Sequence, residues 1–273
     1  MHPHGPPPNQ KLTLPAIRQM IAVASGKGGV GKSTVAANLA LALARLGNKV
    51  GLLDSDIYGP SVPIMMGLAT VDPQTARFPL AKYGIKLMSM GFIVDPKQAV
   101  IWRGPMVHKA VTDFLTKIDW GSLDFLVIDL PPGTGDAQLT LTQTAPLTGA
   151  VIVTTPQDVA LIDARKGLEM FRQVRVPVLG IVENMSYFEP APGQKHYLFG
   201  RGGGPKMAEE AGVPFLGEIP IDPRVTECGD QGEPIVQKHP DSLVAQSFLK
   251  LASALAEAAR LRREADELPM VEL

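Results

Sequence analysis

Cysteine is almost absent from this chain of 273 residues, in which Cys228 is the only one. A single thiol cannot close an intrachain disulfide, which excludes the disulfide-stapled scaffolds of small secreted proteins. Charge of one sign is not in excess either, because 26 Lys and Arg residues oppose 27 Asp and Glu residues, for a formal net charge of −1. The chain therefore lacks the overall positive field that attracts nucleic acid or anionic membranes, and we expect neither as a partner.

Long apolar runs are missing as well. The longest segment without charged residues, 137–157, is interrupted by Thr, Gln and Pro, which a bilayer interior disfavours. The opening segment 1–8 lacks the apolar stretch of a signal peptide, so we expect a cytoplasmic protein. Hydrophobic residues make up 45% of the chain and charged residues 19%, which is typical of a globular protein with a buried core.

The distribution of proline and of hydrophobic periodicity predicts one folded domain. Residues 1–16 are rich in proline and have no periodicity, which is typical of a flexible leader. No linker interrupts residues 17–263, which we expect to form a single domain. Charged residues are frequent in 264–273, and we expect a C-terminal tail there.

Short apolar runs alternate with helical patterns through most of the chain. The runs show no polar alternation and predict strands buried on both faces, at 20–25, 50–54, 125–129, 150–154 and 178–182. Helical periodicity occurs at 33–46, 106–117, 137–144, 159–174 and 206–211, and again after Asp241, a candidate helix cap. This order predicts an α/β fold, a doubly wound, mostly parallel sheet with helices on both faces. Residues 185–204 are expected to form an irregular insertion.

The segment between the first strand and the first helix matches the phosphate-binding pattern G-x-x-x-x-G-K-[ST]. It consists of Gly26, Lys27, Gly28, Gly29, Val30, Gly31, Lys32, Ser33 and Thr34. The glycines allow backbone N–H groups to surround phosphates, and Lys32 supplies a positive charge for the terminal ones. Ser33 is placed to ligate Mg²⁺. The sequence therefore predicts a P-loop NTPase.

Lys27 is not required by the P-loop pattern. A solvated surface lysine and a cation that stabilises transition-state charge, on this nucleotide or on that of a neighbouring subunit, are both compatible with its position. The spacing alone does not decide between them.

Three aspartates follow predicted strands, at the edge where open α/β sheets bind ligands. Asp129 has the Walker-B position, where a carboxylate holds the Mg²⁺ shell. Asp56 lies on a loop just past the strand that ends near Asp54, and is the better candidate for orienting the attacking water. Simple capping of a strand end is the alternative for both.

Several strings together resemble the Mrp/ApbC family of iron–sulfur cluster carriers, within the deviant-Walker MinD/ParA class of ATPases. They are the P-loop with Lys27, Asp54-Ser55-Asp56-Ile57-Tyr58-Gly59-Pro60-Ser61, Trp102-Arg103-Gly104-Pro105-Met106, Asp129-Leu130-Pro131-Pro132-Gly133-Thr134-Gly135-Asp136 and Glu183-Asn184-Met185-Ser186. The resemblance extends from about residue 19 to about residue 236.

The resemblance implies a homodimer that binds ATP and Mg²⁺, hydrolyses ATP slowly, and supports the assembly or transfer of iron–sulfur clusters to apoproteins. Together with the motifs above, it gives Lys27, Lys32, Asp56 and Asp129 as candidate catalytic residues, and it implies that Lys27 reaches the partner's nucleotide. Asp54 and Asp56 would form switch I, and Asp129 would begin switch II. Ser33 and Asp129 would hold Mg²⁺.

The resemblance also places Asn184, with Pro220 and Asp222, near the adenine. The residues themselves support this only in part, because an Asn at a strand end is as often a turn residue as a partner of a base.

The chain departs from the family at the cluster ligands. The family commonly carries Cys-x-x-Cys after the Asn-Met-Ser-Tyr-Phe string, whereas residues 189–193 read Glu-Pro-Ala-Pro-Gly. Cys228 alone cannot supply the set of thiolates that an all-cysteine cluster uses, and we interpret it as a buried, inert side chain. The alternative function is a nucleotide-switched positioning or partner-binding ATPase of MinD/ParA type without a cluster.

Overall fold

The structure is a computed structural model, and it describes residues 12–57, 59–71, 78–92 and 104–267. Tyr58, Trp102 and Arg103, which contribute to the family resemblance, lie outside the described residues. Most of the expected leader, 1–11, and the end of the expected tail, 268–273, lie outside them too.

Within the described residues, the strands form one eight-stranded sheet in the order β3-β4-β2-β5-β1-β6-β7-β8. The strands are β1 (Ile17–Ser25), β2 (Val50–Asp54), β3 (Leu80–Lys82), β4 (Ile85–Ser89), β5 (Leu123–Asp129), β6 (Gly149–Thr154), β7 (Val178–Phe188) and β8 (Phe215–Ile221). All neighbours are parallel except β3 and β4. The predicted mostly parallel α/β sheet is confirmed.

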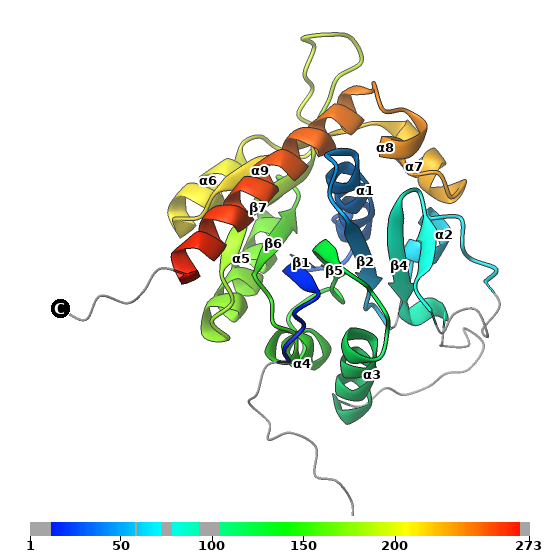
Figure 1. Cartoon of the computed structure of the whole chain (residues 1–273). Coiled ribbons are helices and arrows are strands. Elements are labelled where there is room, and N and C mark those ends of the chain that lie inside the picture. The colour runs from blue at the N-terminus through cyan, green and yellow to red at the C-terminus, as the bar shows by residue number, and fades with distance from the viewer. Residues whose placement is uncertain (1–11, 58, 72–77, 93–103, 268–273) are drawn as a thin grey trace, which may run out of the picture.

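Helices cover both faces of this sheet (Figure 1). They are α1 (Lys32–Arg45), α2 (Val62–Met65), α3 (Gly104–Thr116), α4 (Asp136–Thr144), α5 (Asp158–Gln173), α6 (Gly203–Ala211), α7 (Pro223–Asp230), α8 (Ile235–Lys238) and α9 (Leu243–Glu267). Helix α1 packs against α9 on one face, and the pairs α3–α4 and α5–α6 pack on the other. Right-handed crossovers between parallel strands produce this distribution.

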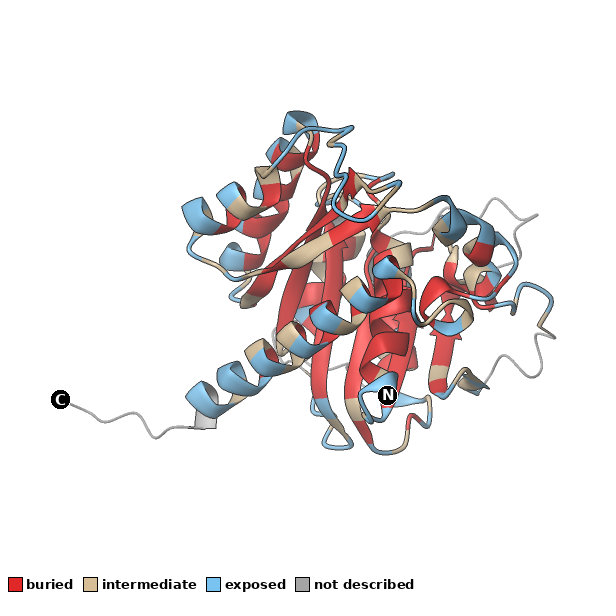
Figure 2. Ribbon diagram, turned by 90° about the horizontal axis from the view of Figure 1, so that it is seen from above, coloured by how far each residue is buried: buried red, intermediate tan, exposed pale blue. Residues whose placement is uncertain are grey.

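The core lies along the central strands, which are buried over most of their length, whereas the outer faces of the helices are exposed (Figure 2). Strand β1 is the clearest case, because every residue from Gln19 to Ser25 is buried. Because both faces of such a strand are covered by helices, none of its side chains faces solvent and polar residues need not alternate with apolar ones. This explains the unbroken apolar runs in the sequence.

The structure corrects three details of the sequence interpretation. Strand β7 continues to Phe188, so the irregular segment begins after Phe188 and not at Met185. The Ser242 hydroxyl oxygen, rather than Asp241, accepts the Ala245 N–H at the start of α9. Helix α9 runs to Glu267, into the segment expected as a tail.

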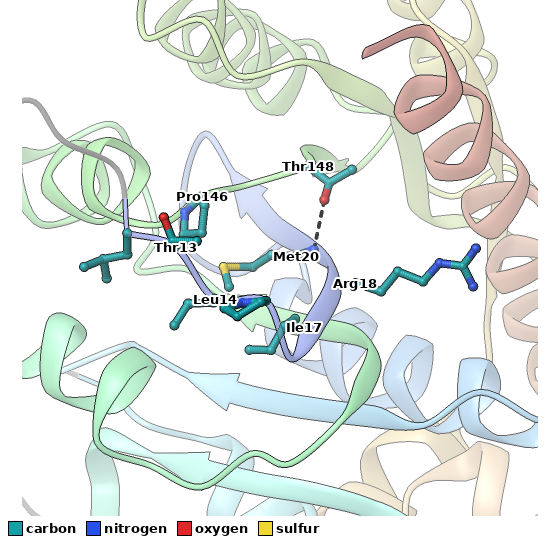
Figure 3. Close-up of a pocket in the computed structure, with 9 residues that line it drawn as sticks. Thr13, Leu14, Ile17, Arg18, Met20, Pro146 and Thr148 are labelled. Atoms are coloured by element: carbon teal, nitrogen blue, oxygen red, sulfur yellow. Dashed lines mark hydrogen bonds between the residues drawn. The ribbon is translucent and has the colours of Figure 1, made fainter. Parts of the chain in front are cut away.

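A cavity of about 230 Å³ lies at the amino ends of β1 and β6, at the edge of the sheet opposite to the P-loop (Figure 3). Leu14, Met20 and Pro146 line it, and the Met20 N–H donates to the Thr148 hydroxyl at 3.0 Å. None of the predicted site residues lies in its lining. No helix among the described residues has the length and apolar character needed to cross a membrane.

Candidate nucleotide site

The P-loop connects the carboxyl end of β1 to the first turn of α1. Gly31 precedes α1 with a φ of 80°, and Gly29 has a φ of 82°, a left-handed conformation that side chains rarely adopt. Gly26 is required for another reason, because a Cβ there would lie 2.1 Å from the backbone carbonyl of Asp163 on α5. These glycines shape a loop that turns sharply and fits closely against its neighbours.

Lys32 and Asp129 form a buried ion pair at the base of this loop. The Lys32 Nζ atom lies 2.6 Å from Asp129 Oδ1, and the two side chains are 6% and 0% exposed. Lys32 Nζ also lies 3.2 Å from the Ser33 hydroxyl. The three side chains that the sequence assigned to phosphate and Mg²⁺ binding are therefore brought together.

Only one of the two Asp129 carboxylate oxygens is paired with Lys32. Its Oδ2 atom is buried and has no hydrogen-bond partner within the described part of the chain. Burial raises the pKa of the Asp129 carboxyl, against the opposing effect of the Lys32 charge. A buried oxygen without a donor, next to the Ser33 hydroxyl, matches the oxygen ligands that Mg²⁺ prefers, so the residues present fit this ion.

Asp54 lies beside Asp129 in the sheet, because the two residues are register partners in β2 and β5. The Ser89 hydroxyl donates to Asp54 Oδ2 at 2.9 Å, and the Asp56 N–H donates to Oδ1 at 3.1 Å. Burial, together with the nearby charge of Asp129, raises the pKa of Asp54 to about 7. Two adjacent buried carboxylates create a negative centre that favours a cation.

Asp56 lies on the loop after β2 and is also buried. Its Oδ1 atom accepts the Gly59 N–H at 3.1 Å, which fixes the turn that leads to α2. Between the two aspartates, Ser55 donates from both its hydroxyl and its N–H to the Asp129 carbonyl, at 2.7 and 3.0 Å. The two expected switch segments are thus hydrogen-bonded to each other.

Lys27 is partly exposed at the mouth of the loop. Its carbonyl accepts the Ser25 hydroxyl at 2.9 Å, so the backbone is fixed while the side chain is accessible to solvent. This placement is compatible with both interpretations of Lys27 given above.

Asn184 on β7 contacts the P-loop directly. Its Nδ2 atom donates to the Val30 carbonyl at 2.8 Å, and a Cβ on Gly31 would lie 2.3 Å from the same atom. In the sheet Asn184 is the register partner of Ile219, which places the buried Pro220 next to it. Asp222 caps α7 by accepting the Arg224 N–H at 2.9 Å and pairs with the Arg224 guanidinium at 2.6 Å.

Two further polar residues of this region were assigned no role from the sequence. Ser89, on β4, is the hydroxyl that holds Asp54. Glu183, next to Asn184, is fully buried and accepts the Ser186 hydroxyl and the Gly204 N–H, both at 2.6 Å. The Ser89–Asp54 and Gly204–Glu183 contacts join elements that are distant in sequence, and no local pattern indicates them.

Cys228 is 2% exposed on α7 and belongs to the hydrophobic core, as predicted. Burial raises the pKa of its thiol. Among the described residues, no group of three or more His, Cys, Asp or Glu side chains could hold a metal ion. The described residues therefore do not fit a cluster bound by this chain alone.

Comparisons with known proteins agree with this geometry. The family model of NUBPL iron-transfer P-loop NTPases, in the ParA class, matches residues 16–256. The iron-sulfur cluster carrier protein of Aquifex aeolicus (strain VF5) is 57% identical over 250 residues, covering 89% of this chain and 69% of that protein. The iron-sulfur cluster transfer protein NUBPL of Mus musculus is 50% identical over 252 residues, covering 90% of this chain and 79% of that protein.

Solved structures of P-loop proteins are similar to this chain as well. The nucleotide-binding protein from Archaeoglobus fulgidus, in complex with ADP, is 42% identical with a TM-score of 0.70, and the match covers 85% of this chain and 96% of that one. The cell division ATPase MinD of Pyrococcus furiosus is 25% identical with a TM-score of 0.66, covering 88% and 99%. The P-loop, the aspartates at the strand ends and these similarities lead to one conclusion: the chain belongs to the NUBPL iron-transfer family of ParA-class P-loop NTPases.

Proposed function

We propose that this chain binds ATP with Mg²⁺, hydrolyses it slowly as a homodimer, and supports the assembly or transfer of iron–sulfur clusters to apoproteins in the cytoplasm. The observation that carries the nucleotide part is the buried Lys32–Asp129 pair at the base of the P-loop, with the second Asp129 oxygen lacking a partner among the described residues. A buried Lys–Asp pair next to a P-loop, with one carboxylate oxygen left over, is an arrangement that a phosphate and a cation would complete.

In the proposed site, the glycine amides and Lys32 bind the phosphates, and Ser33 and Asp129 hold Mg²⁺. The bound ion would offset the negative charge of the terminal phosphates. Asp56 orients the attacking water, since its carboxylate lies on the loop beside Asp54 and Asp129. Lys27, at the exposed mouth of the loop, stabilises the developing charge on the nucleotide of the second subunit.

The adenine is proposed to lie near Asn184, Pro220 and Asp222, which the β7–β8 pairing brings to one edge of the sheet. Asn184 reaches the P-loop carbonyl of Val30 with its amide nitrogen, which leaves its amide oxygen to accept from the base.

The iron–sulfur role rests on the family and on the printed names of the relatives, which are carriers and transfer proteins. In this chain the cluster is cargo, and its thiolates have to come largely from elsewhere, because Cys228 is buried. We therefore propose that it works with a separate scaffold or with the apo clients themselves.

Three assays test this proposal. Phosphate release from ATP, with and without Mg²⁺, is expected to require Lys32, and light scattering with ATP is expected to report a dimer. Activation of an apo-ferredoxin by Fe²⁺, sulfide and dithiothreitol is expected to be faster with the protein and ATP than with the Lys32→Ala variant. Equal activation by both would contradict the iron–sulfur part.

A second candidate is a partner-binding ATPase with no role in iron chemistry, which the buried position of Cys228 favours. The rate at which an apo client gains iron and sulfide from a cluster source under anaerobic conditions, with and without this protein, separates the two. Acceleration of client loading supports the carrier role, and its absence supports the second candidate.

A further inference from the structure

Large apolar side chains are exposed on the first turns of α5 and in the segment that leads into α6, two segments that come close where a Cβ on Gly200 would lie 3.5 Å from the Pro156 carbonyl oxygen. Val159 and Ile162, on the first turns of α5, are 64% and 53% exposed. Leu198 and Phe199, in the segment before α6, are 61% and 38% exposed. We call this group the α5–α6 surface. Exposed apolar side chains that gather in one place, rather than singly, are typical of contact sites.

A basic cavity of about 340 Å³ adjoins one of these side chains, Phe199. Phe199 and Leu161 line it together with three cations, Arg165, Arg201 and Lys206, and with one carboxylate, Asp158. The lining thus carries three positive charges and one negative charge. The cavity therefore favours an anionic partner.

The cations differ in how they are held. Arg165 and Lys206 approach Glu210 on α6, at 2.8 and 3.9 Å. Arg201 lies 4.7 Å from the centre of the Tyr197 ring and makes no ion pair with any described carboxylate. Of the three cations, its guanidinium is the most available to donate hydrogen bonds to a carboxylate of another molecule.

The α5–α6 surface is held in place by close backbone packing. A Cβ on Gly203 would lie 2.9 Å from the Pro156 carbonyl oxygen, and the Gly204 N–H donates to the buried Glu183. The Tyr187 and Tyr197 rings are 6.2 Å apart, and Lys195 lies over Tyr187 at 3.8 Å. A surface fixed in advance loses little conformational entropy on binding.

The same helix connects this surface to the P-loop, because the Asp163 carbonyl of α5 is the group that excludes a side chain at Gly26. We propose that the α5–α6 surface docks an acidic segment of a partner protein that also carries large apolar side chains, with Arg201 pairing a carboxylate and Phe199 and Ile162 contacting the apolar groups. Given the proposed function, this partner is the apo client. Charge complementarity selects the acidic segment, and the exposed apolar side chains add contact area.

The test measures binding of defined peptides by fluorescence anisotropy, without nucleotide or cluster. The probe is a fluorescein-labelled peptide with alternating Glu and Leu, compared with one in which Lys replaces Glu and one in which Ser replaces Leu. Arg201→Glu and Ile162→Ser are expected to weaken binding of the Glu/Leu probe by about tenfold each. The matched controls Arg18→Glu, at the opposite edge of the sheet, and Leu261→Ser, on α9, are expected to stay within about twofold.

Circular dichroism checks that each variant folds, and calorimetry with ATP tests the nucleotide site separately, so failure of the docking proposal is distinguishable from failure of the proposed function. Equal affinity for the Glu/Leu and Lys/Leu probes, or unchanged affinity of both surface variants, would overturn the proposal. If sedimentation showed self-association lost in Arg201→Glu while no probe bound, the surface would be a contact between copies of this chain, which also overturns it.

Discussion

Lys32 Nζ and Asp129 Oδ1, which lie 97 residues apart in the chain, are 2.6 Å apart at the base of the P-loop. Both side chains are buried, so each charge depends on the other for compensation. Asp129 is also tied to the loop of Asp54 and Asp56 through Ser55, which donates twice to its carbonyl. The pair is therefore the point at which the phosphate loop and both expected switch segments meet.

The contact between Gly26 and α5 predicts a stability difference between two glycine variants. Gly26→Ala is expected to destabilise the fold by about 1–3 kcal/mol, because its Cβ would meet the Asp163 backbone at 2.1 Å. Gly28→Ala is the matched control, since nothing lies within 4 Å of a Cβ there. Denaturant unfolding of both variants measures the difference, and equal free energies of unfolding would show that the loop does not pack against α5 as described.

The raised pKa of Asp54 predicts a dependence of stability on pH. Its carboxyl titrates near 3.8 when exposed and at about 7 in the folded chain. Between these values the folded state holds a proton that the unfolded state has released, so Asp54 lowers stability progressively as pH rises through this window. Asp54→Asn removes the effect, and its gain in unfolding free energy over wild type is expected to be larger at pH 8 than at pH 5.

Guanidinium unfolding at both pH values measures that gain, with Asp230→Asn, a change at an exposed site, as the control. A gain for Asp54→Asn that is the same at pH 5 and pH 8 would argue against a buried, protonated Asp54.

The sequence was sufficient to predict the parallel sheet and the P-loop, and it assigned Lys32 and Asp129, which the structure shows in contact, to one site. Each has a local signature, either an unbroken apolar run or a glycine pattern at a strand end. The contacts of Ser89 with Asp54 and of Glu183 with Gly204 have no such signature, because they join different elements of the fold. Strands β3, β4 and β8 were not predicted either. Strand β3 has only three residues, and β4 and β8 mix polar with apolar residues and so lack the unbroken apolar run of the predicted strands.

Hydrolysis is expected to depend on Lys27 and Asp56 more than nucleotide binding does. Both are proposed to act on the attacking water or on charge that develops in the transition state, which raises kcat without strengthening the bound ground state. Lys27→Ala and Asp56→Asn are each expected to retain ATP affinity within about threefold and to lose about a hundredfold or more in phosphate release.

Mixed dimers of the two variants extend this test. Partial recovery of turnover would support action of Lys27 on the partner's nucleotide. Parallel losses of affinity and turnover in both single variants would speak against the proposed division of roles.

Cluster binding by the isolated chain is expected to be weak or absent, because residues 189–193 contain no cysteine and Cys228 is buried. Anaerobic reconstitution of wild type and Cys228→Ser, read by visible absorption and iron content, checks this. Any cluster that does form on wild type is expected to be lost in Cys228→Ser. A stable, stoichiometric cluster retained by Cys228→Ser would mean that other side chains act as ligands.

The central claim is that the P-loop built around Lys32 is an ATP site, and calorimetric titration of wild type and Lys32→Ala with ATP and Mg²⁺ tests it most directly. Removing Lys32 deletes the positive charge that the glycine amides cannot replace and leaves Asp129 buried without its partner. Circular dichroism of the variant controls for loss of the fold. We predict saturable binding by wild type and no measurable binding by folded Lys32→Ala, whereas unchanged affinity in the variant would contradict the assignment of this loop as the nucleotide site.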